Sequence, residues 1–189
     1  MVSEFERLQL RDNITLLRRD GLDRLFLALR CGAYHLTDIR GNEGIRRSSS
    51  IEPNDGRFPD TYPQSANSYG RLRNYVSLFD FETPTIRECL SMYMVWVNFF
   101  TTRGSAKVLL KLDRDRLVPN LIPNEAAKEE ARREKKTWLR HVEVWYPEPI
   151  PFAWVTGCVL VLPTRPIEFS VYNADNLGLG SLDRALDAL

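Results

Sequence analysis

Polar side chains interrupt three short apolar runs of this chain, and their types are those that bind and activate ligands. The runs read as buried strands and cover residues 33–37, 75–79 and 141–145. The polar residues that stand out in them are, in chain order, His35, Thr37, Tyr75, Ser77 and Glu143. A polar group inside such a strand costs free energy unless it is hydrogen bonded or used. This ordered set is therefore the candidate functional site.

His35 and Thr37 would lie on one face of a strand, because successive side chains alternate between the two faces. One ring nitrogen and one hydroxyl on the same face suit the recognition of a ligand hydroxyl or amide. A lone histidine on a strand is more often a satisfied core or surface residue. That alternative stays open.

Tyr75 and Ser77 repeat the pattern, with Val76 and Leu78 on the opposite face. An aromatic ring beside a hydroxyl offers a stacking surface with a hydrogen-bonding group, which is what a planar heteroaromatic ligand needs. The alternative is a half-exposed edge strand that shows polar residues to water.

Glu143 is the strongest single position. Its apolar neighbours on either side should point into the core, so we expect it to share the opposite face with His141 and Trp145. A carboxylate near an aromatic ring can bind a sugar hydroxyl and stabilise positive charge that develops at an anomeric carbon. The alternative is an exposed glutamate that pairs with Lys136 or Arg140.

No metal site is expected. His141 and Glu143 could in principle share a metal, but no cysteine or aspartate lies nearby in the sequence. The cysteines, Cys31, Cys89 and Cys158, form no Cys-x-x-Cys pair. The sequence also lacks the phosphate-cradling Gly-x-x-x-x-Gly-Lys, the Gly-x-Ser-x-Gly elbow and the His-Glu-x-x-His metal pair.

The bulk properties fit one soluble domain. The chain has 189 residues, of which 43% are hydrophobic and 27% charged, and a net charge of +1 that predicts no general attraction to nucleic acid or membrane. Widely spaced cysteines favour a reducing compartment, and the first residues lack the apolar core of a signal peptide. The most apolar stretch, Leu90 to Phe100, is too short to span a bilayer. We expect one cytoplasmic α+β domain over residues 1–189, without membrane association.

Hydrophobic periodicity and turn residues predict where the elements lie. We expect strands at 34–37, 75–81, 108–112, 141–145, 153–162 and 167–171. We expect helical segments at 14–30, 39–47, 85–100 and 124–136, and a Leu-rich helical end. Asp38 should cap the second of these helices. Residues 48–74 are rich in Ser, Pro, Asn and Gly, and we expect a long loop, which is often functional.

The ordered polar set resembles a known signature. A His-x-Thr pair, a Tyr-x-Ser pair after a long polar loop and a glutamate on a late strand resemble the three motifs of ADP-ribosyltransferases of the His-Tyr-Glu type. Within that superfamily the chain resembles the DarT-like bacterial toxins, which modify DNA bases using NAD. The run from Tyr34 to Arg40 resembles the opening strand and turn of that group, and the run from Val142 to Val155 its catalytic-glutamate strand.

This resemblance implies an α+β fold with a split, mainly antiparallel β core and flanking helices, and NAD as the substrate without a metal. It implies that Glu143 holds the ribose and activates the acceptor, while His35 bonds the nicotinamide ribose and Thr37 supports the cofactor nearby. Tyr75 would stack on nicotinamide, and Ser77 would stabilise the strand and the glutamate.

Arginines of the first third of the chain are candidates for the NAD diphosphate, because a guanidinium contacts phosphate in a bidentate manner. The candidates are Arg46, Arg47 and Arg57. The sequence does not choose among them. The loop at 48–74 would correspond to the element that covers NAD.

The segment before Glu143 carries a local charge excess that could follow a phosphate backbone. Its cations are Arg132, Arg133, Lys135, Lys136 and Arg140, against one acid, Glu134, a net +4. Trp138 adds a stacking platform for a base. Many relatives carry Gln or Glu two residues before the catalytic glutamate, a position linked to protein acceptors, whereas this chain has His141. A merely solvated helix face is the alternative for the basic run.

These observations predict an NAD-dependent mono-ADP-ribosyltransferase that modifies nucleic acid, DNA more than RNA, as a bacterial toxin or defence effector. An antitoxin or inhibitor protein is a candidate partner. Within the same fold, transfer to a protein side chain and an RNA 2′-phosphotransferase-like reaction are the alternatives. From another class, a non-catalytic interaction domain would leave the polar residues as mere surface.

Overall fold

Most strands of this chain join one antiparallel sheet. A computed structural model describes residues 15–17, 29–30, 32–58, 63–92, 107–164 and 168–173. The described strands are β1 (Thr15–Leu17), β2 (Ala33–Asp38), β3 (Ser50–Ile51), β4 (Val76–Asp80), β5 (Lys107–Leu112), β6 (Glu143–Tyr146), β7 (Ile150–Pro151), β8 (Val155–Thr164) and β9 (Glu168–Asn173). The described helices, with 3-10 helices labelled η, are α3 (Ile39–Ser48), η2 (Pro63–Asn67), α4 (Tyr69–Arg73), α5 (Ile86–Ser91), α7 (Arg114–Leu117), η3 (Val118–Asn120), α8 (Asn124–Arg133) and η4 (Phe152–Trp154).

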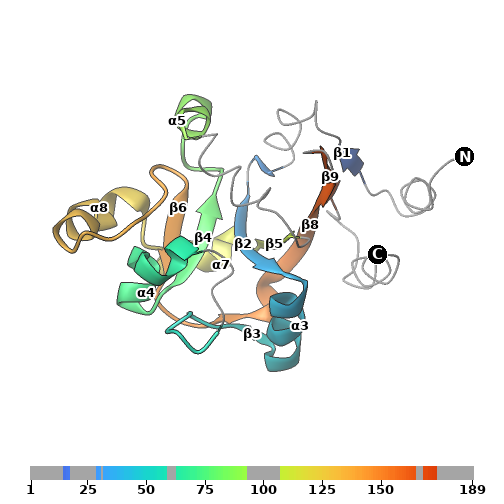
Figure 1. Ribbon diagram of the computed structural model, residues 1–189, viewed down its shortest axis with the longest axis horizontal. Helices are drawn as coiled ribbons and strands as arrows, with labels where there is room; N and C mark the ends of the chain where they lie inside the picture. The colour runs from blue at the N-terminus through green and yellow to red at the C-terminus, as the bar shows by residue number, and fades with distance from the viewer. Residues whose placement is uncertain are drawn as a thin grey trace, which may run out of the picture.

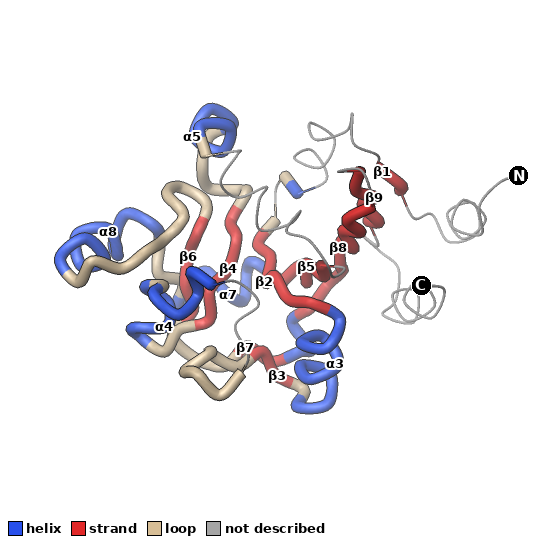
Figure 2. Tube along the Cα trace, in the orientation of Figure 1, coloured by secondary structure: helices blue, strands red, loops and turns tan. Residues whose placement is uncertain are grey.

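The sheet has seven strands in the order β1-β9-β8-β5-β2-β4-β6, and β3 and β7 form a separate two-stranded sheet. Every pair of these strands runs antiparallel. Figure 1 shows the sheet crossing the molecule, with α4 and α8 beside its β6 edge and α3 toward the other side of β2. Figure 2 shows the same strands as one red band with the helices around it. The predicted α+β class, with a mainly antiparallel sheet and flanking helices, is confirmed.

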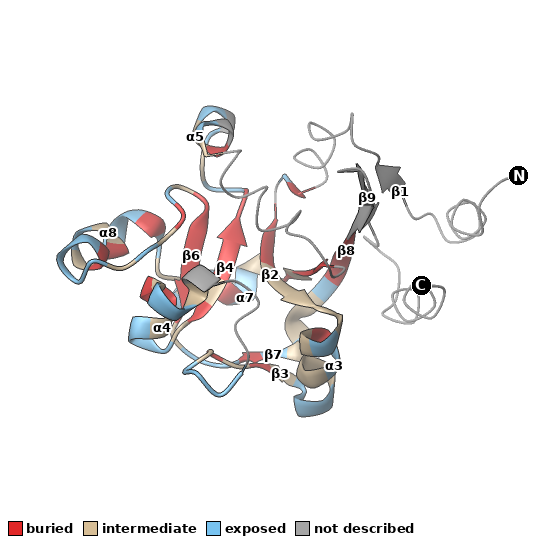
Figure 3. Ribbon diagram, viewed as in Figure 1, coloured by how far each residue is buried: buried red, intermediate tan, exposed pale blue. Residues whose placement is uncertain are grey.

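The central strands are buried on both faces, as Figure 3 shows for β4 and β6. On β4, Val76 and Leu78 belong to one apolar cluster and Phe79 to another. Side chains alternate between the two faces of a strand, so Val76 and Leu78 reach one cluster and Phe79 reaches the other. Helix α5 contributes to the second cluster through Cys89. A third cluster forms where α4 and α8 pack against Trp145 of β6.

The start of α3 follows from one local contact. The carboxylate of Asp38 accepts a hydrogen bond from the amide of Gly41 at 2.7 Å, which satisfies one of the free N–H groups of the first turn. The helix ends at Ser48, because Ser49 adopts the left-handed conformation at φ 59°. The predicted β2 strand, the cap and the helix after it are confirmed.

Three sequence-based expectations about elements are wrong. Residues 15–17 lie in the segment expected to be helical at 14–30, but they form β1, because they pair with β9 through Leu16 and Tyr172. The segment 48–74 is not a plain loop: it contains β3, η2 and α4, and β3 forms by pairing with the distant β7. A local pattern cannot reveal such distant partners.

The third correction concerns the run 141–145. Strand β6 begins at Glu143, and His141 lies in the preceding turn at φ 65°. His141 therefore does not share a strand face with Glu143. Similarly, α8 stops at Arg133 rather than at 136, because Lys135 adopts φ 51°. The expected helix at 85–100 is present as α5, and residues 93–100 and the Leu-rich end lie outside the described residues.

Among the described residues, no helix has the length and apolar character to cross a membrane.

Candidate functional site

Strands β2 and β4 separate soon after they pair, and the candidate residues lie around this opening. All six residues of β2 pair with β5, but only Ala33 and Tyr34 pair with β4, opposite Asp80 and Phe79. Beyond these pairs the hydrogen-bonded ladder between β2 and β4 ends. Backbone groups that lose their ladder partners must find others. This opening is therefore a place where side chains and ligands can bond to the sheet.

His35 lies at the opening. Its Nδ1 is 3.3 Å from the carbonyl oxygen of Ser77 on β4. Because a carbonyl can only accept, a neutral ring in this bond carries its proton on Nδ1 and leaves Nε2 as an acceptor. Desolvation lowers the pKa of His35 from 6.5 to about 4, against the opposing effect of the bond to Ser77. The imidazole is therefore neutral near pH 7 and can accept a hydrogen bond from a ligand hydroxyl.

Glu143 is a buried acid at the start of β6, with 8% of its surface exposed. Its Oε2 accepts a hydrogen bond from the amide of Leu139 at 2.7 Å. Burial raises the pKa of Glu143 from 4.5 to about 7, although the Leu139 amide, the Ser77 hydroxyl and the Trp145 indole all favour the charged form. The alternative of an exposed, ion-paired glutamate is therefore wrong. A carboxyl group with a pKa near 7 is suited to proton transfer at neutral pH.

The turn from Leu139 to Glu143 is closed by its own bonds and tied to α8. The Glu143 amide donates to the Leu139 carbonyl at 3.1 Å, and the Glu143 carboxylate bonds the Leu139 amide. The buried Asn124 at the start of α8 donates from Nδ2 to the carbonyls of Leu139 at 2.8 Å and Glu143 at 2.7 Å. The turn is thus held by hydrogen bonds between Leu139 and Glu143 and by two hydrogen bonds from Asn124. The Glu143 carboxylate is therefore held at its oxygen by Leu139, and the backbone of Glu143 is held by Asn124.

Ser77 links the two halves of the site. Its carbonyl bonds His35, and its hydroxyl acts on the Glu143 carboxylate. In the register of the sheet, Glu143 is opposite Phe79 and so projects on the same face as Ser77, whereas His35 is opposite Leu110. Because side chains alternate along a strand, those of His35 and Glu143 leave the sheet on different faces. The described link between them runs through Ser77.

Gly70 of α4 packs against β4 and β6. A Cβ atom at this position would overlap the Ser77 hydroxyl and lie 3.2 Å from Nε1 of Trp145. Only glycine lets the helix approach this closely. Gly70 therefore sets how tightly Ser77 and Trp145 are held beside Glu143.

Tyr75 and Thr37 have structural surroundings that the sequence did not show. Tyr75 directly precedes β4, is half-buried, and lies edge-on to Tyr69 with ring centroids 6.5 Å apart. The Thr37 hydroxyl packs against Gly41 at the start of α3, where a Cβ would overlap it. Thr37 thus supports the junction between β2 and α3. Stacking by Tyr75 on nicotinamide stays a prediction.

Two of the three arginines that are candidates for the diphosphate, Arg47 and Arg57, lie on the surface, one in α3 and one in the segment after β3. Arg47 is exposed in the last turn of α3 and donates to the Glu43 carbonyl at 3.4 Å. Arg57 is exposed, pairs with Asp55 at 2.8 Å and lies over the ring of Phe58. Their described contacts do not bring them together with His35, and their role stays a prediction.

The basic run before Glu143 is only partly available to an anion. Arg132 pairs with Glu129, and Arg133 pairs with Glu134, each at 3.2 Å. Lys136 donates to the side chain of Asn67. A set of residues from this run and from α8 nevertheless surrounds one cavity of about 120 Å³, lined by Asn124, Glu125, Lys128, Arg132, Trp138, Arg140 and His141. The structure thus groups Arg132, Trp138 and Arg140, and leaves Arg133 and Lys136 outside this lining.

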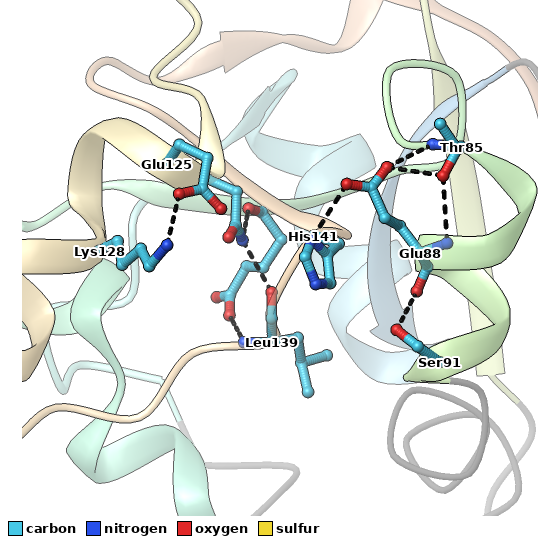
Figure 4. A network of polar contacts seen from close by, with 9 residues as sticks. Thr85, Glu88, Ser91, Glu125, Lys128, Leu139 and His141 are labelled. Carbon is cyan, nitrogen blue, oxygen red and sulfur yellow. Dashed lines mark hydrogen bonds and ion pairs between the residues drawn. The ribbon is translucent and has the colours of Figure 1, made fainter.

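A second cavity of about 360 Å³ lies on the neighbouring side of the same turn. It is lined by Asp80, Thr83, Pro84, Glu88, Arg114, Val118, Leu121, Pro123, Asn124, Glu125, His141 and Val144. His141 belongs to both cavities, and Figure 4 shows it between Glu88 and Glu125. Its Nδ1 is 3.7 Å from Glu88. The left-handed turn at His141 thus links α5 to the segment that carries Glu143.

Two residues that matter at the site were not singled out for it from sequence: Asn124 and Gly70. An asparagine at the start of a helix reads as a local cap, so its long bonds to a later turn gave no signal. A glycine inside a polar segment reads as a loop residue. Trp145 was placed on the face of Glu143, and that placement agrees with the register of β6, but its unbonded N–H was not foreseen.

The described residues assemble a neutral histidine acceptor, a buried acid that titrates near neutrality and a serine that contacts both. The histidine can accept a hydrogen bond from a ligand hydroxyl, and the acid can take up a proton. Comparison of the chain with protein-family models, with curated proteins and with solved structures finds no match.

Proposed function

We propose that this protein is an NAD-dependent mono-ADP-ribosyltransferase whose sheet is the split β core of that fold. The single observation that carries the proposal is the linkage at the opening between β2 and β4. There the Ser77 carbonyl lies 3.3 Å from the neutral His35 imidazole, and the Ser77 side chain shares a sheet face with the buried Glu143 carboxyl, whose charged form the Ser77 hydroxyl favours. The strand order β6-β4-β2 puts the glutamate, serine and histidine strands side by side, in agreement with the sequence resemblance.

The residues present suit NAD as a substrate. Nε2 of His35 can accept a hydrogen bond from a ribose hydroxyl, because Nδ1 is engaged with Ser77. Glu143 in its ionised form can accept a hydrogen bond from a sugar hydroxyl. Tyr75, half-buried directly before β4, offers an aromatic ring for the nicotinamide.

The reaction then needs no group beyond these. The bond between the anomeric carbon of the ribose and the nicotinamide nitrogen breaks, and nicotinamide leaves with the bonding electron pair as a neutral molecule. The Glu143 carboxylate stabilises the positive charge left on the sugar. A nucleophilic atom of the acceptor forms the new bond to the anomeric carbon, and its proton passes to Glu143, for which a pKa of about 7 is suited.

Nucleic acid, and DNA more than RNA, is the acceptor that we favour. Arg132, Trp138 and Arg140 line one cavity beside the turn that holds Glu143. Guanidinium groups bind phosphate, and an indole can stack on a base. On the resemblance described above, the biological role is that of a bacterial toxin or defence effector acting in the cytoplasm, with an antitoxin or inhibitor protein as its partner.

Transfer of label from NAD tests the proposal. The protein is incubated with adenylate-labelled NAD and, in parallel, with single-stranded DNA, duplex DNA, RNA and a protein extract. We expect label on DNA, and we expect Glu143→Gln to lower the rate by at least about a hundredfold, the scale of lost transition-state charge stabilisation. The matched control is Glu148→Gln, because Glu148 is an exposed glutamate just after β6.

The acceptor arms separate the alternatives. Label on protein alone would replace the nucleic-acid assignment while leaving the reaction intact. Loss of a 2′-phosphate from RNA with NAD consumed would favour the phosphotransferase-like reaction. Neither label transfer nor nicotinamide release in any arm, with Glu143→Gln identical to the parent, would refute the enzyme proposal.

A further inference from the structure

The indole N–H of Trp145 is a buried donor that makes no hydrogen bond of ordinary geometry within the described residues. Trp145 has 0% of its surface exposed, and its indole is nevertheless close enough to Glu143 to favour the charged form of that acid. Buried tryptophan N–H groups are usually bonded. An unpaired donor in this position costs free energy unless an acceptor comes within its reach.

The Trp145 side chain lies on the same face of β6 as Glu143 and is packed tightly there. The two residues are separated by one position on β6 and so project on the same face. The Trp145 backbone is fixed by a pair of bonds to Ile122, at 2.8 and 3.1 Å. Its ring is held on one side by Gly70, with 3.2 Å between Nε1 and an added Cβ, and by the edge of Tyr69, with centroids 4.9 Å apart. The indole is thus held in place by its packing.

We propose that Trp145 is a positioning residue for Glu143, and that its indole N–H completes a set of three donors, with the Leu139 amide and the Ser77 hydroxyl, that holds the carboxylate in its ionised form. A protonated acid is a weaker hydrogen-bond acceptor than a carboxylate. When the acid ionises, the carboxylate becomes a strong acceptor for all three groups. Only the catalytic consequence of this set rests on the function proposed above.

Among the residues that the structure describes, no charged side chain competes with this set in setting the ionisation of Glu143. The influences on its pKa are burial, the Leu139 amide, Ser77 and Trp145. The charged groups on the surrounding helices are paired with one another. Glu130 of α8 accepts from the Tyr69 hydroxyl at 2.6 Å and pairs with Arg73 of α4, and Glu88 of α5 faces His141. His35 contacts the backbone of Ser77 rather than the acid.

A direct titration of the carboxyl group tests the inference without using activity. The protein is labelled with ¹³C-glutamate, and the Glu143 signal is assigned from its absence in Glu143→Gln. In Trp145→Phe we expect the pKa of Glu143 to rise by about one to two pH units, the effect of removing one hydrogen bond to a charged group. In Trp154→Phe, a tryptophan packed edge-on to Tyr146 with centroids 6.0 Å apart, we expect no change. An unchanged pKa in Trp145→Phe would overturn the inference.

A second measurement covers the case in which Trp145→Phe does not fold. In the parent protein, the ¹⁵N-bound indole proton of Trp145 should shift with pH and titrate with the same midpoint as Glu143. In Glu143→Gln that signal should not respond to pH over the same range. An indole signal that is independent of pH in the parent would overturn the inference as well.

The rate profile then connects the inference to catalysis. If the pKa rises by about one unit, transfer by Trp145→Phe at pH 6 falls about tenfold and recovers nearly to the parent rate at pH 9. A mere packing defect would lower the rate at both pH values. If the titration shifts but no label is ever transferred, the proposed function fails while the link between Trp145 and Glu143 stands. If label is transferred and the titration does not shift, the proposed function stands and the link between Trp145 and Glu143 fails.

Discussion

Replacing Glu143 by glutamine should make the folded protein more stable at alkaline pH. The buried carboxyl of Glu143 has a pKa raised from 4.5 to about 7. Because the folded state binds this proton more tightly than the unfolded chain, its contribution to stability is complete below pH 4.5 and is lost as the pH rises to about 7. At about 1.4 kcal/mol per pH unit, this interval corresponds to a loss of about 3 kcal/mol.

Glutamine removes the titration while keeping the shape. Its side-chain oxygen can still accept from the Leu139 amide, which lies 2.7 Å from the carboxylate. At pH 4.5 we therefore expect the variant and the parent to differ in unfolding free energy by less than about 1 kcal/mol. At pH 8 we expect the variant to be more stable by about 3 kcal/mol, the full titration term.

Urea unfolding followed by tryptophan fluorescence at pH 4.5 and 8 measures these free energies by linear extrapolation. Glu148→Gln is the control, because this exposed residue should give the same difference from the parent at both pH values. A stability difference for Glu143→Gln that does not change between pH 4.5 and 8 would refute the reasoning. The acid would then titrate in the folded state as it does in the unfolded chain.

Other changes have equally specific outcomes. The folded-state pKa of His35 is about 4, below its ordinary value of 6.5, so the parent loses stability as the pH falls from 7 to 4. His35→Gln lacks this titration, and its unfolding free energy should rise by up to about 3 kcal/mol relative to the parent over that range. Equal loss of stability in acid for both proteins, measured by urea unfolding, would contradict this prediction. Asn124→Leu should cost about 2–4 kcal/mol in unfolding free energy, since two buried carbonyls lose their donor. Asp38→Ala should cost about 1 kcal/mol through the lost cap, measured by thermal unfolding. Arg140→Ala should weaken DNA binding and reduce by about one the slope of log affinity against log salt, whereas Arg116→Ala should not.

The parts of the fold that sequence reasoning recovered are those with local causes. Strand β2 alternates apolar and polar residues, and Asp38 caps the helix that follows within three residues. The parts that it missed have distant causes. Residues 15–17 form a strand because β9 supplies their partner, and His141 leaves the strand because Asn124 holds the turn next to it.

The features of the candidate site also divide into those that the sequence indicated and those that depend on distant contacts. The types of His35, Ser77 and Glu143 indicated binding and proton transfer, and the structure links them in series. The burial of Glu143 was not predicted, because it depends on α4 and α8 covering β6. The roles of Gly70 and Trp145 depend on the register of two strands and the approach of one helix, which no single segment encodes.

The two hydrogen bonds that Asn124 donates have a consequence for the motion of this region. One amide group holds the carbonyls of both Leu139 and Glu143, so helix α8 and the turn cannot open separately. The amide protons of these two residues should therefore exchange with solvent at one common rate, set by a single opening event. Under the function proposed above, a nucleic acid bound along α8 would slow that exchange at Glu143 itself, and the acceptor would then steady this carboxyl before any bond is made.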